Sequence, residues 1–167
     1  MRRLALIPAV LIVVLVVAPP ATASPSITTT PSDFVLDSEQ CPNLATGTTL
    51  EGSGIEKAIE TDRTANGVTT IINATHTHGT TTDQDGNVYV FDYSNEFRVS
   101  NTVSDPDTYT GLMTDHFSNS GRGPAKLNNG FVANITTDFS TFFTFDPISS
   151  FGDPLNFDDG SARCDPL

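Results

Sequence analysis

The chain has 167 residues, of which 37% are hydrophobic, and its 20 acidic side chains outnumber the 8 basic ones to give a formal net charge of −12. A surface this acidic repels phosphate backbones and anionic lipid headgroups, so we expect no nucleic-acid and no membrane partners. The length suits one domain with a sizeable core, whose bulk comes from eleven phenylalanines, because there is no tryptophan.

The first 23 residues have the three parts of a secretory signal peptide. Arg2 and Arg3 precede an apolar run, and the segment 19–23 (PPATA) has the small residues of a cleavage site. The apolar run of about 15 residues is shorter than the roughly 20 that a membrane-spanning helix needs, which disfavours an anchor. We therefore expect cleavage after Ala23 and a secreted, extracellular product. Losing the two arginines leaves 6 basic against 20 acidic side chains, a net charge of −14.

Beyond residue 24 the sequence predicts an all-β chain. No segment shows a sustained 3.6-residue apolar period, whereas Thr, Val, Ile, Phe and Tyr alternate in short runs between Asn-Gly, Asp-Gly and Pro signals. Residues 24–32 are predicted as a flexible lead-in and residues 33–167 as the domain. Its first strands are expected at Phe34–Asp37 and Thr48–Glu51.

Asn66-Gly67 predicts a two-residue hairpin turn, because both central residues of a type I′ turn need positive φ. Residues of the two flanking strands then pair when their numbers add to 133. That register sets Lys57 opposite His76.

The clearest strand is Val88–Val99, in which aromatic and polar residues alternate, so one face is expected to be buried. Asp85-Gly86 before it predicts a second two-residue turn, with residue numbers adding to 171. The expected pairs are Thr80 with Phe91, His78 with Tyr93 and His76 with Asn95. The buried face is expected to carry Tyr89, Phe91, Tyr93, Phe97 and Val99.

Three further alternating segments follow, in residues 109–117, 131–135 and 139–145, before a stretch from Pro147 onward that is predicted as coil. The total is about eight strands joined mostly by short turns. This pattern predicts an antiparallel meander, which we expect to close into a barrel whose interior holds side chains or one small ligand.

Cys41 and Cys164 stand near the two ends of the domain. Because export implies an oxidising compartment, we expect them to form a disulfide. In the chain-entropy model such a wide loop contributes roughly 4 to 5 kcal/mol. Two free thiols, or a metal site that uses cysteine, are the alternatives.

The layout of the chain resembles that of a group of small secreted proteins. A Phe-centred first strand runs into Cys41-Pro42, the meander has Asn-Gly and Asp-Gly turns, and the chain closes with Ala162-Arg163-Cys164-Asp165. In this it resembles the uncharacterised two-cysteine secreted proteins of actinobacteria. Some of those resemble eight-stranded barrels of the lipocalin or allene-oxide-cyclase type. The resemblance implies a barrel and no particular activity.

The predicted register gathers polar side chains on the aromatic face. Lys57, His76 and Asn95 fall in one row across three strands, with His78 and Tyr93 in the next row. Polar groups inside an apolar cavity are typical of small-ligand pockets. The predicted ligand-binding residues are Lys57, His76, His78, Tyr89, Phe91, Tyr93, Asn95 and Phe97. A turn longer than two residues would instead put Lys57 and His76 in water.

A metal site is a weaker interpretation of the His76-Thr77-His78 pair. A third ligand is needed, and the strand parity turns His116 outward if Met113 and Phe117 point inward. The segment Asp83–Asn87 has the start of a calcium loop but not its later glycine and glutamate, so it is predicted to be a hairpin turn. We expect no metal and no cofactor.

We therefore expect a secreted barrel that binds a small apolar or aromatic ligand in its interior. One alternative is a cyclase or isomerase that uses His76 or His78 as a base. The other is a non-catalytic extracellular protein that contacts a partner through Asp92, Glu96 and Arg98. No sequence feature indicates the oligomeric state.

Overall fold

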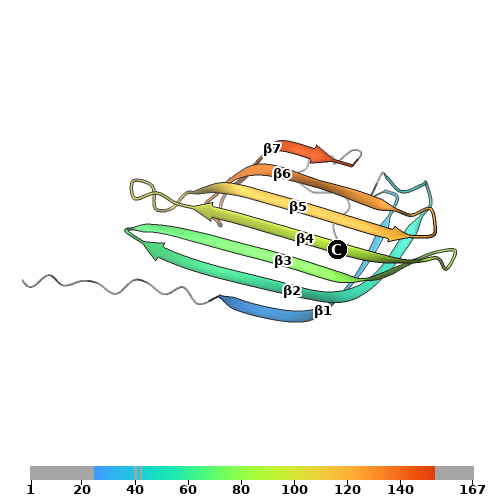
Figure 1. Cartoon of the computed structure of the whole chain (residues 1–167). Helices are drawn as coiled ribbons and strands as arrows, with labels where there is room; N and C mark the ends of the chain where they lie inside the picture. The colour runs from blue at the N-terminus through green and yellow to red at the C-terminus, as the bar shows by residue number, and fades with distance from the viewer. Residues whose placement is uncertain (1–24, 40, 42, 153–167) are drawn as a thin grey trace, which may run out of the picture.

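A computed structural model of the chain describes residues 25–39, 41 and 43–152. The predicted signal peptide and Cys164 lie outside these residues. In these described residues seven strands follow one another in a single antiparallel sheet of order β1 to β7, which confirms the all-β meander (Figure 1). No helix in the described part of the chain has the length and apolarity to cross a membrane. The strands are β1 Ser26–Asp37, β2 Thr49–Ala65, β3 Val68–Asp83, β4 Val88–Ser100, β5 Tyr109–Gly121, β6 Leu127–Thr137 and β7 Phe143–Phe151.

The strands differ from the prediction at both ends of the domain. Residues 26–32, expected as a flexible lead-in, belong to β1 and pair with β2. Residues 147–151, expected as coil, belong to β7 and pair with β6 beyond a register shift at Val132/Ala133. Prolines fit both places, because Pro31 and Pro147 lie in the two outermost strands of the described sheet, where a ladder can lack an N–H donor.

The sheet curls so strongly that β1 touches β5. The ring of Phe34 in β1 meets Phe91 of β4 edge-on with centroids 4.7 Å apart, and Phe117 of β5 at 6.2 Å. In Figure 1 one end of β1 and β2 rises behind the middle strands. We call the face that carries these rings the inner face and the opposite one the outer face. Within the described residues β1 and β7 are not hydrogen-bonded to each other, so closure into a barrel stays a prediction.

The main core fills the curled end of the inner face. A Cβ built on Gly52 would lie 2.3 Å from the ring of Phe34, and one on Gly79 would lie 2.6 Å from the ring of Phe91. Each ring therefore occupies space that a side chain on β2 or β3 would need. The core residues are Phe34, Leu36, Cys41, Leu44, Leu50, Tyr89, Phe91, Phe117, Ala125 and Leu127.

The predicted turn at Asn66-Gly67 is confirmed. Both residues have positive φ, 53° and 78°, and Ala65 stands opposite Val68. The register of β2 and β3 is the expected one, with Lys57 opposite His76.

The predicted two-residue turn at Asp85-Gly86 is wrong. The loop has three residues, because the amide of Asp83 donates to the carbonyl of Asn87 at 3.1 Å while the Gly86 amide donates to the Asp83 carbonyl at 3.0 Å. Gly86 alone takes positive φ, at 80°. Asp83 Oδ1 also accepts the amides of Asp85 and Asn87, which fastens the longer loop.

One extra residue in this loop turns β3 over relative to β4, since side chains alternate between faces. His76 therefore stands opposite Ser94 and His78 opposite Asp92, while Asn95 stands opposite Thr75. The predicted row of Lys57, His76 and Asn95 is wrong, and the alternative of a longer turn is the one that the structure adopts.

Candidate functional site

The structure divides the eight predicted ligand-binding residues between two faces. The three basic residues Lys57, His76 and His78 lie on the outer face, where 55% of the His76 side chain and 61% of the His78 side chain are exposed. The other five lie on the inner face: Tyr89, Phe91, Tyr93, Asn95 and Phe97.

Tyr89 and Phe91 belong to the filled end of the interior. Both are fully buried, and the Tyr89 hydroxyl donates to Asp83 Oδ2 at 2.7 Å while it accepts the amide of Ala125 at 3.1 Å. Burial and the hydrogen bond to Asp83 raise the pKa of Tyr89. These two residues belong to the packed core, because Phe34 and Phe117 pack around Phe91.

Asp83 links this part of the core to the hairpin loop. Burial alone would raise its pKa, but hydrogen bonds from Asn87, Tyr89 and the amide of Asp85 outweigh burial and hold the pKa below its ordinary value. The hydrogen bonds that its carboxylate accepts come from Asp85, Asn87 and Tyr89. The prediction of a hairpin turn at Asp83–Asn87 is confirmed.

A buried carboxylate lies in the middle of the inner face. Asp115 of β5 is only 5% exposed, and its Oδ2 accepts a hydrogen bond from the Tyr93 hydroxyl at 3.0 Å and from Asn95 Nδ2 at 2.9 Å. Tyr93 and Asn95 are half-buried. Asp115 stands opposite Phe131 of β6, so an ionisable group is held among aromatic side chains.

A second aromatic cluster bounds this region on the side away from Phe34. Phe139, in the turn after β6, packs its ring on Phe97 and Tyr109 with centroid separations of 6.3 and 5.1 Å. Phe139 has φ 59°, a conformation that is strained for a bulky residue.

The turn that holds Phe139 is built on Asp138. Its carboxylate accepts the hydroxyl and amide of Thr141 and the amides of Ser140 and Phe142, and these bonds hold its pKa far below the usual range. Residues at strained φ persist where the surrounding structure determines them, and they cluster at functional sites.

Charge is divided unequally between the two faces. Strand alternation and the cross-strand pairs place every Lys and Arg of the described strands, which are Lys57, Arg63 and Arg98, on the outer face. Three carboxylates of β2 join Asp115 on the inner face: Glu56, Glu60 and Asp62.

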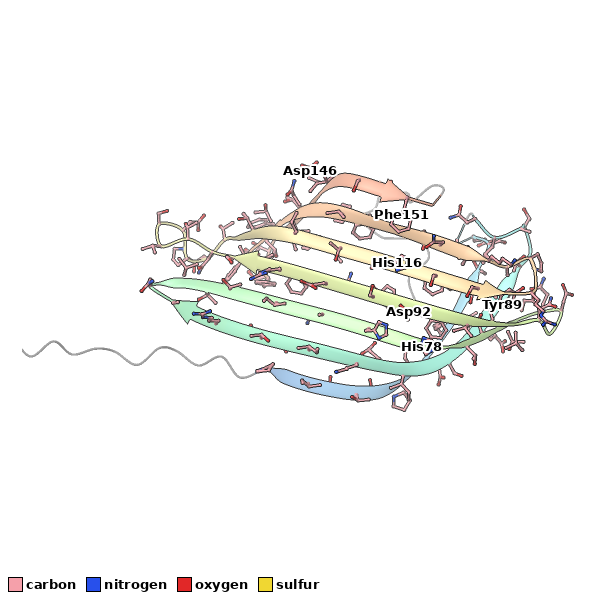
Figure 2. The ribbon with its side chains drawn as sticks, in the orientation of Figure 1. His78, Tyr89, Asp92, His116, Asp146 and Phe151 are labelled. Atoms are coloured by element: carbon pink, nitrogen blue, oxygen red, sulfur yellow. The ribbon has the colours of Figure 1, made fainter. Side chains whose placement is uncertain are left out.

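The outer face holds its own polar cluster (Figure 2). His76 Nε2 and His78 Nδ1 lie 3.1 and 3.3 Å from the same oxygen of Asp92, Oδ2. His116 lies on this face too, as its predicted outward parity required, with Nε2 3.0 Å from Asn128 Oδ1.

A shallow groove of about 370 Å³ runs beside this cluster. Among the described residues no group of three or more His, Cys, Asp or Glu side chains is arranged to hold a metal ion. The outer face therefore offers an exposed hydrogen-bonded surface. The groove is lined by Lys57, Ile59, Ala74, Thr75, His76, Ser94, Asn95, Glu96 and Thr114.

Asp115 was not predicted as a site residue, although the sequence pattern indicates that its side chain points inward. Met113 and Phe117 were both expected to point inward, and alternation then sends Asp115 inward as well. Comparison with known proteins adds no relative to these observations: no protein-family model, curated protein or solved structure matches the chain.

Proposed function

We propose that the protein is a secreted binding protein that holds a small, partly aromatic ligand against the middle of the inner face of its sheet. The observation that carries this proposal is the buried Asp115 carboxylate, which Tyr93 and Asn95 orient between two aromatic clusters. Of the eight residues predicted from the sequence, Tyr93, Asn95 and Phe97 keep this role.

Burying a carboxylate is costly unless hydrogen bonds compensate, and the same side chain at the surface would avoid the cost. Small-ligand sites combine apolar and aromatic walls with a few fixed polar groups. The half-buried Tyr93, Asn95, Phe97 and Met113 around Asp115 have this composition and keep some access to solvent. The strained Phe139 adds an aromatic ring at the border of the same region.

The proposal includes closure of the curled sheet into a barrel and the Cys41–Cys164 disulfide. Contact between β1 and β5 through Phe34 and Phe117 supports closure, because it brings strands four apart in the sheet order together. Burial of Cys41 in the core supports a structural role for it. Export and an extracellular location rest on the sequence alone.

The exposed cluster of His76, His78 and Asp92 favours a second candidate, an extracellular protein that contacts a partner through its outer face. The groove beside the cluster supplies both polar and apolar contacts. A cyclase or isomerase with an interior histidine has less support, because the histidines lie outside the aromatic face.

Titration of the ¹⁵N-labelled mature protein with a library of soluble aromatic fragments, both neutral and charged, tests the proposal. Binders are expected to shift the amide signals of Tyr93 and Met113, and Phe97→Ala is expected to weaken their binding about tenfold or more through lost aromatic contact.

Val90→Ala is the matched control, because Val90 lies on the outer face of the same strand and is exposed. The proposal fails if no fragment shifts the signals of the inner face. It also fails if the shifts gather at Ser94 and Thr114, which would favour the outer-face candidate.

A further inference from the structure

We infer that the groove on the outer face is a second binding site, which takes a small zwitterion with an aliphatic part, such as an aliphatic amino acid. The groove lies on the face that carries the labelled His78 and Asp92 in Figure 2, opposite to the face of the proposed ligand. The inference comes from the shape of the groove and from two opposite charges on its rim.

The groove arises where two small side chains lie among larger ones. Ala74 of β3 stands opposite Glu96, and Ser94 of β4 stands opposite His76, so the two small residues are diagonal neighbours on the outer face. Both are half-buried, whereas Glu96 and His76 are exposed and rise on either side of them. The resulting volume of about 370 Å³ is at the lower end of the roughly 300–1,000 Å³ of small-molecule sites, which favours a small ligand.

One wall of the groove is apolar. Ile59 of β2 stands directly opposite Ala74, and both line the groove and are half-buried. Burial of hydrocarbon against such a wall is favourable, so an aliphatic part of a ligand is expected to lie here.

Lys57 and Glu96 carry opposite charges on the rim of the groove. Both are exposed, and they belong to β2 and β4, which are separated by β3. Within the described part of the chain neither side chain forms an ion pair or a side-chain hydrogen bond. A ligand carboxylate beside Lys57 and a ligand ammonium beside Glu96 would pair both charges at once.

A ligand with a single charge fits this rim less well. An anion is attracted by Lys57 but repelled by Glu96, and a cation meets the opposite situation. The two charges therefore favour a zwitterion over either kind of ion.

Two hydroxyl groups complete the polar part of the groove. Ser94 lies on its floor and Thr114 of β5, opposite Glu96, lies on its rim. Neither hydroxyl is hydrogen-bonded to another described residue. A hydroxyl can donate to a carboxylate or accept from an ammonium, so both ends of a zwitterion find partners here.

Three compounds with the same branched carbon chain test the inference. Leucine carries both charges, 3-methylbutylamine lacks its carboxylate, and 4-methylpentanoate lacks its ammonium. Each is titrated at pH 7 into the ¹⁵N-labelled mature protein, and leucine is expected to shift the amide signals of Ser94 and Thr114. It is expected to bind at least about threefold more tightly than either singly charged compound. If one of these binds as tightly as leucine, or if leucine shifts neither signal, the inference is overturned.

Lys57→Met tests the carboxylate end, because it removes the charge and keeps most of the side-chain length. Leucine is expected to bind this variant no more tightly than 3-methylbutylamine does. Arg63→Met is the matched control, since Arg63 is exposed on the outer face of the same strand, does not line the groove and changes the net charge equally. Equal losses in both variants would show only a general effect of net charge and would refute the inference.

Glu96→Gln tests the ammonium end. Leucine is expected to bind it no more tightly than 4-methylpentanoate does, whereas Glu51→Gln, an exposed position on the same face but outside the groove, is expected to leave the affinity unchanged. An unchanged affinity for leucine in Glu96→Gln would overturn the inference. The comparison of the three compounds on the unaltered protein does not depend on how well the variants fold.

This inference and the proposed function can fail separately. Aromatic fragments report on the inner face through Tyr93 and Met113, and leucine reports on the outer face through Ser94 and Thr114. Loss of one response leaves the other proposal standing.

Discussion

Replacement of Phe34 by alanine tests whether the sheet curls as the structure shows. Phe34 is 4% exposed, and its ring fills the space over Gly52 and contacts Phe91 and Phe117 across the curled inner face. Loss of the ring removes the contact between β1 and β5 and leaves a cavity. Both effects destabilise the fold.

Truncation of a buried Phe to Ala costs about 3–5 kcal/mol, which includes roughly 0.5–1.5 kcal/mol from the edge-on pair with Phe91. With a urea m-value of about 2 kcal/mol/M, the midpoint of unfolding is expected to fall by roughly 2 M. Urea titration followed by far-UV circular dichroism measures it. The m-value is expected to stay constant, because the change affects stability and not the surface exposed on unfolding.

Val35→Ala is the matched control, because Val35 is the next residue of β1 but points to the outer face and is 46% exposed. It is expected to cost less than about 1 kcal/mol. A loss below 1 kcal/mol for Phe34→Ala, or equal losses in both variants, would mean that β1 does not pack over β4 and β5, and the division into inner and outer faces would lose its basis.

Three further predictions concern the loop and the cysteines. Because the fold lowers the pKa of Asp83, the stabilising contribution of this carboxylate is complete above the unfolded pKa of about 3.9 and is lost as pH falls below it. Urea titrations from pH 7 to 2.5 should show the stability of Asp83→Asn approaching that of the unaltered protein at low pH. A stability difference that stays constant over this pH range would contradict the prediction. Gly86→Ala is expected to cost about 1–2 kcal/mol by thermal unfolding, purely through its φ of 80°, because an added Cβ has open space around it; an unchanged melting temperature would argue against the positive φ at Gly86. Intact-mass measurement should find the secreted protein two hydrogens lighter than its reduced form, and alkylation of Cys41 and Cys164 without reductant would rule the disulfide out.

The sequence was sufficient to predict the strand class and one of the two hairpin registers. Alternation of aromatic and polar residues in β4 fixes which of its side chains are buried, because a strand exposes every second residue to the same face. Asn66-Gly67 predicts its register correctly, since both residues can take the positive φ that a two-residue turn requires.

The second register could not be predicted from Asp85-Gly86 alone. The same dipeptide serves a two-residue turn or the end of a three-residue one with only the glycine at positive φ. Asp83 decides between them, because its carboxylate binds the amides of the longer loop and also the hydroxyl of Tyr89 in the next strand. That decision depends on a contact with the buried core, which a local pattern does not contain.

The length of this one loop also decides the chemistry of the inner face. The Asn66-Gly67 turn ties β2 to β3, so these two strands turn over together when the loop before β4 changes by one residue. A two-residue loop would bring Lys57 and Arg63 onto the face that carries Asp115. The three-residue loop brings Glu56 and Glu60 there instead. The set of β2 and β3 side chains that share a face with Asp115 therefore follows from the same hydrogen bonds to Asp83 that set the register.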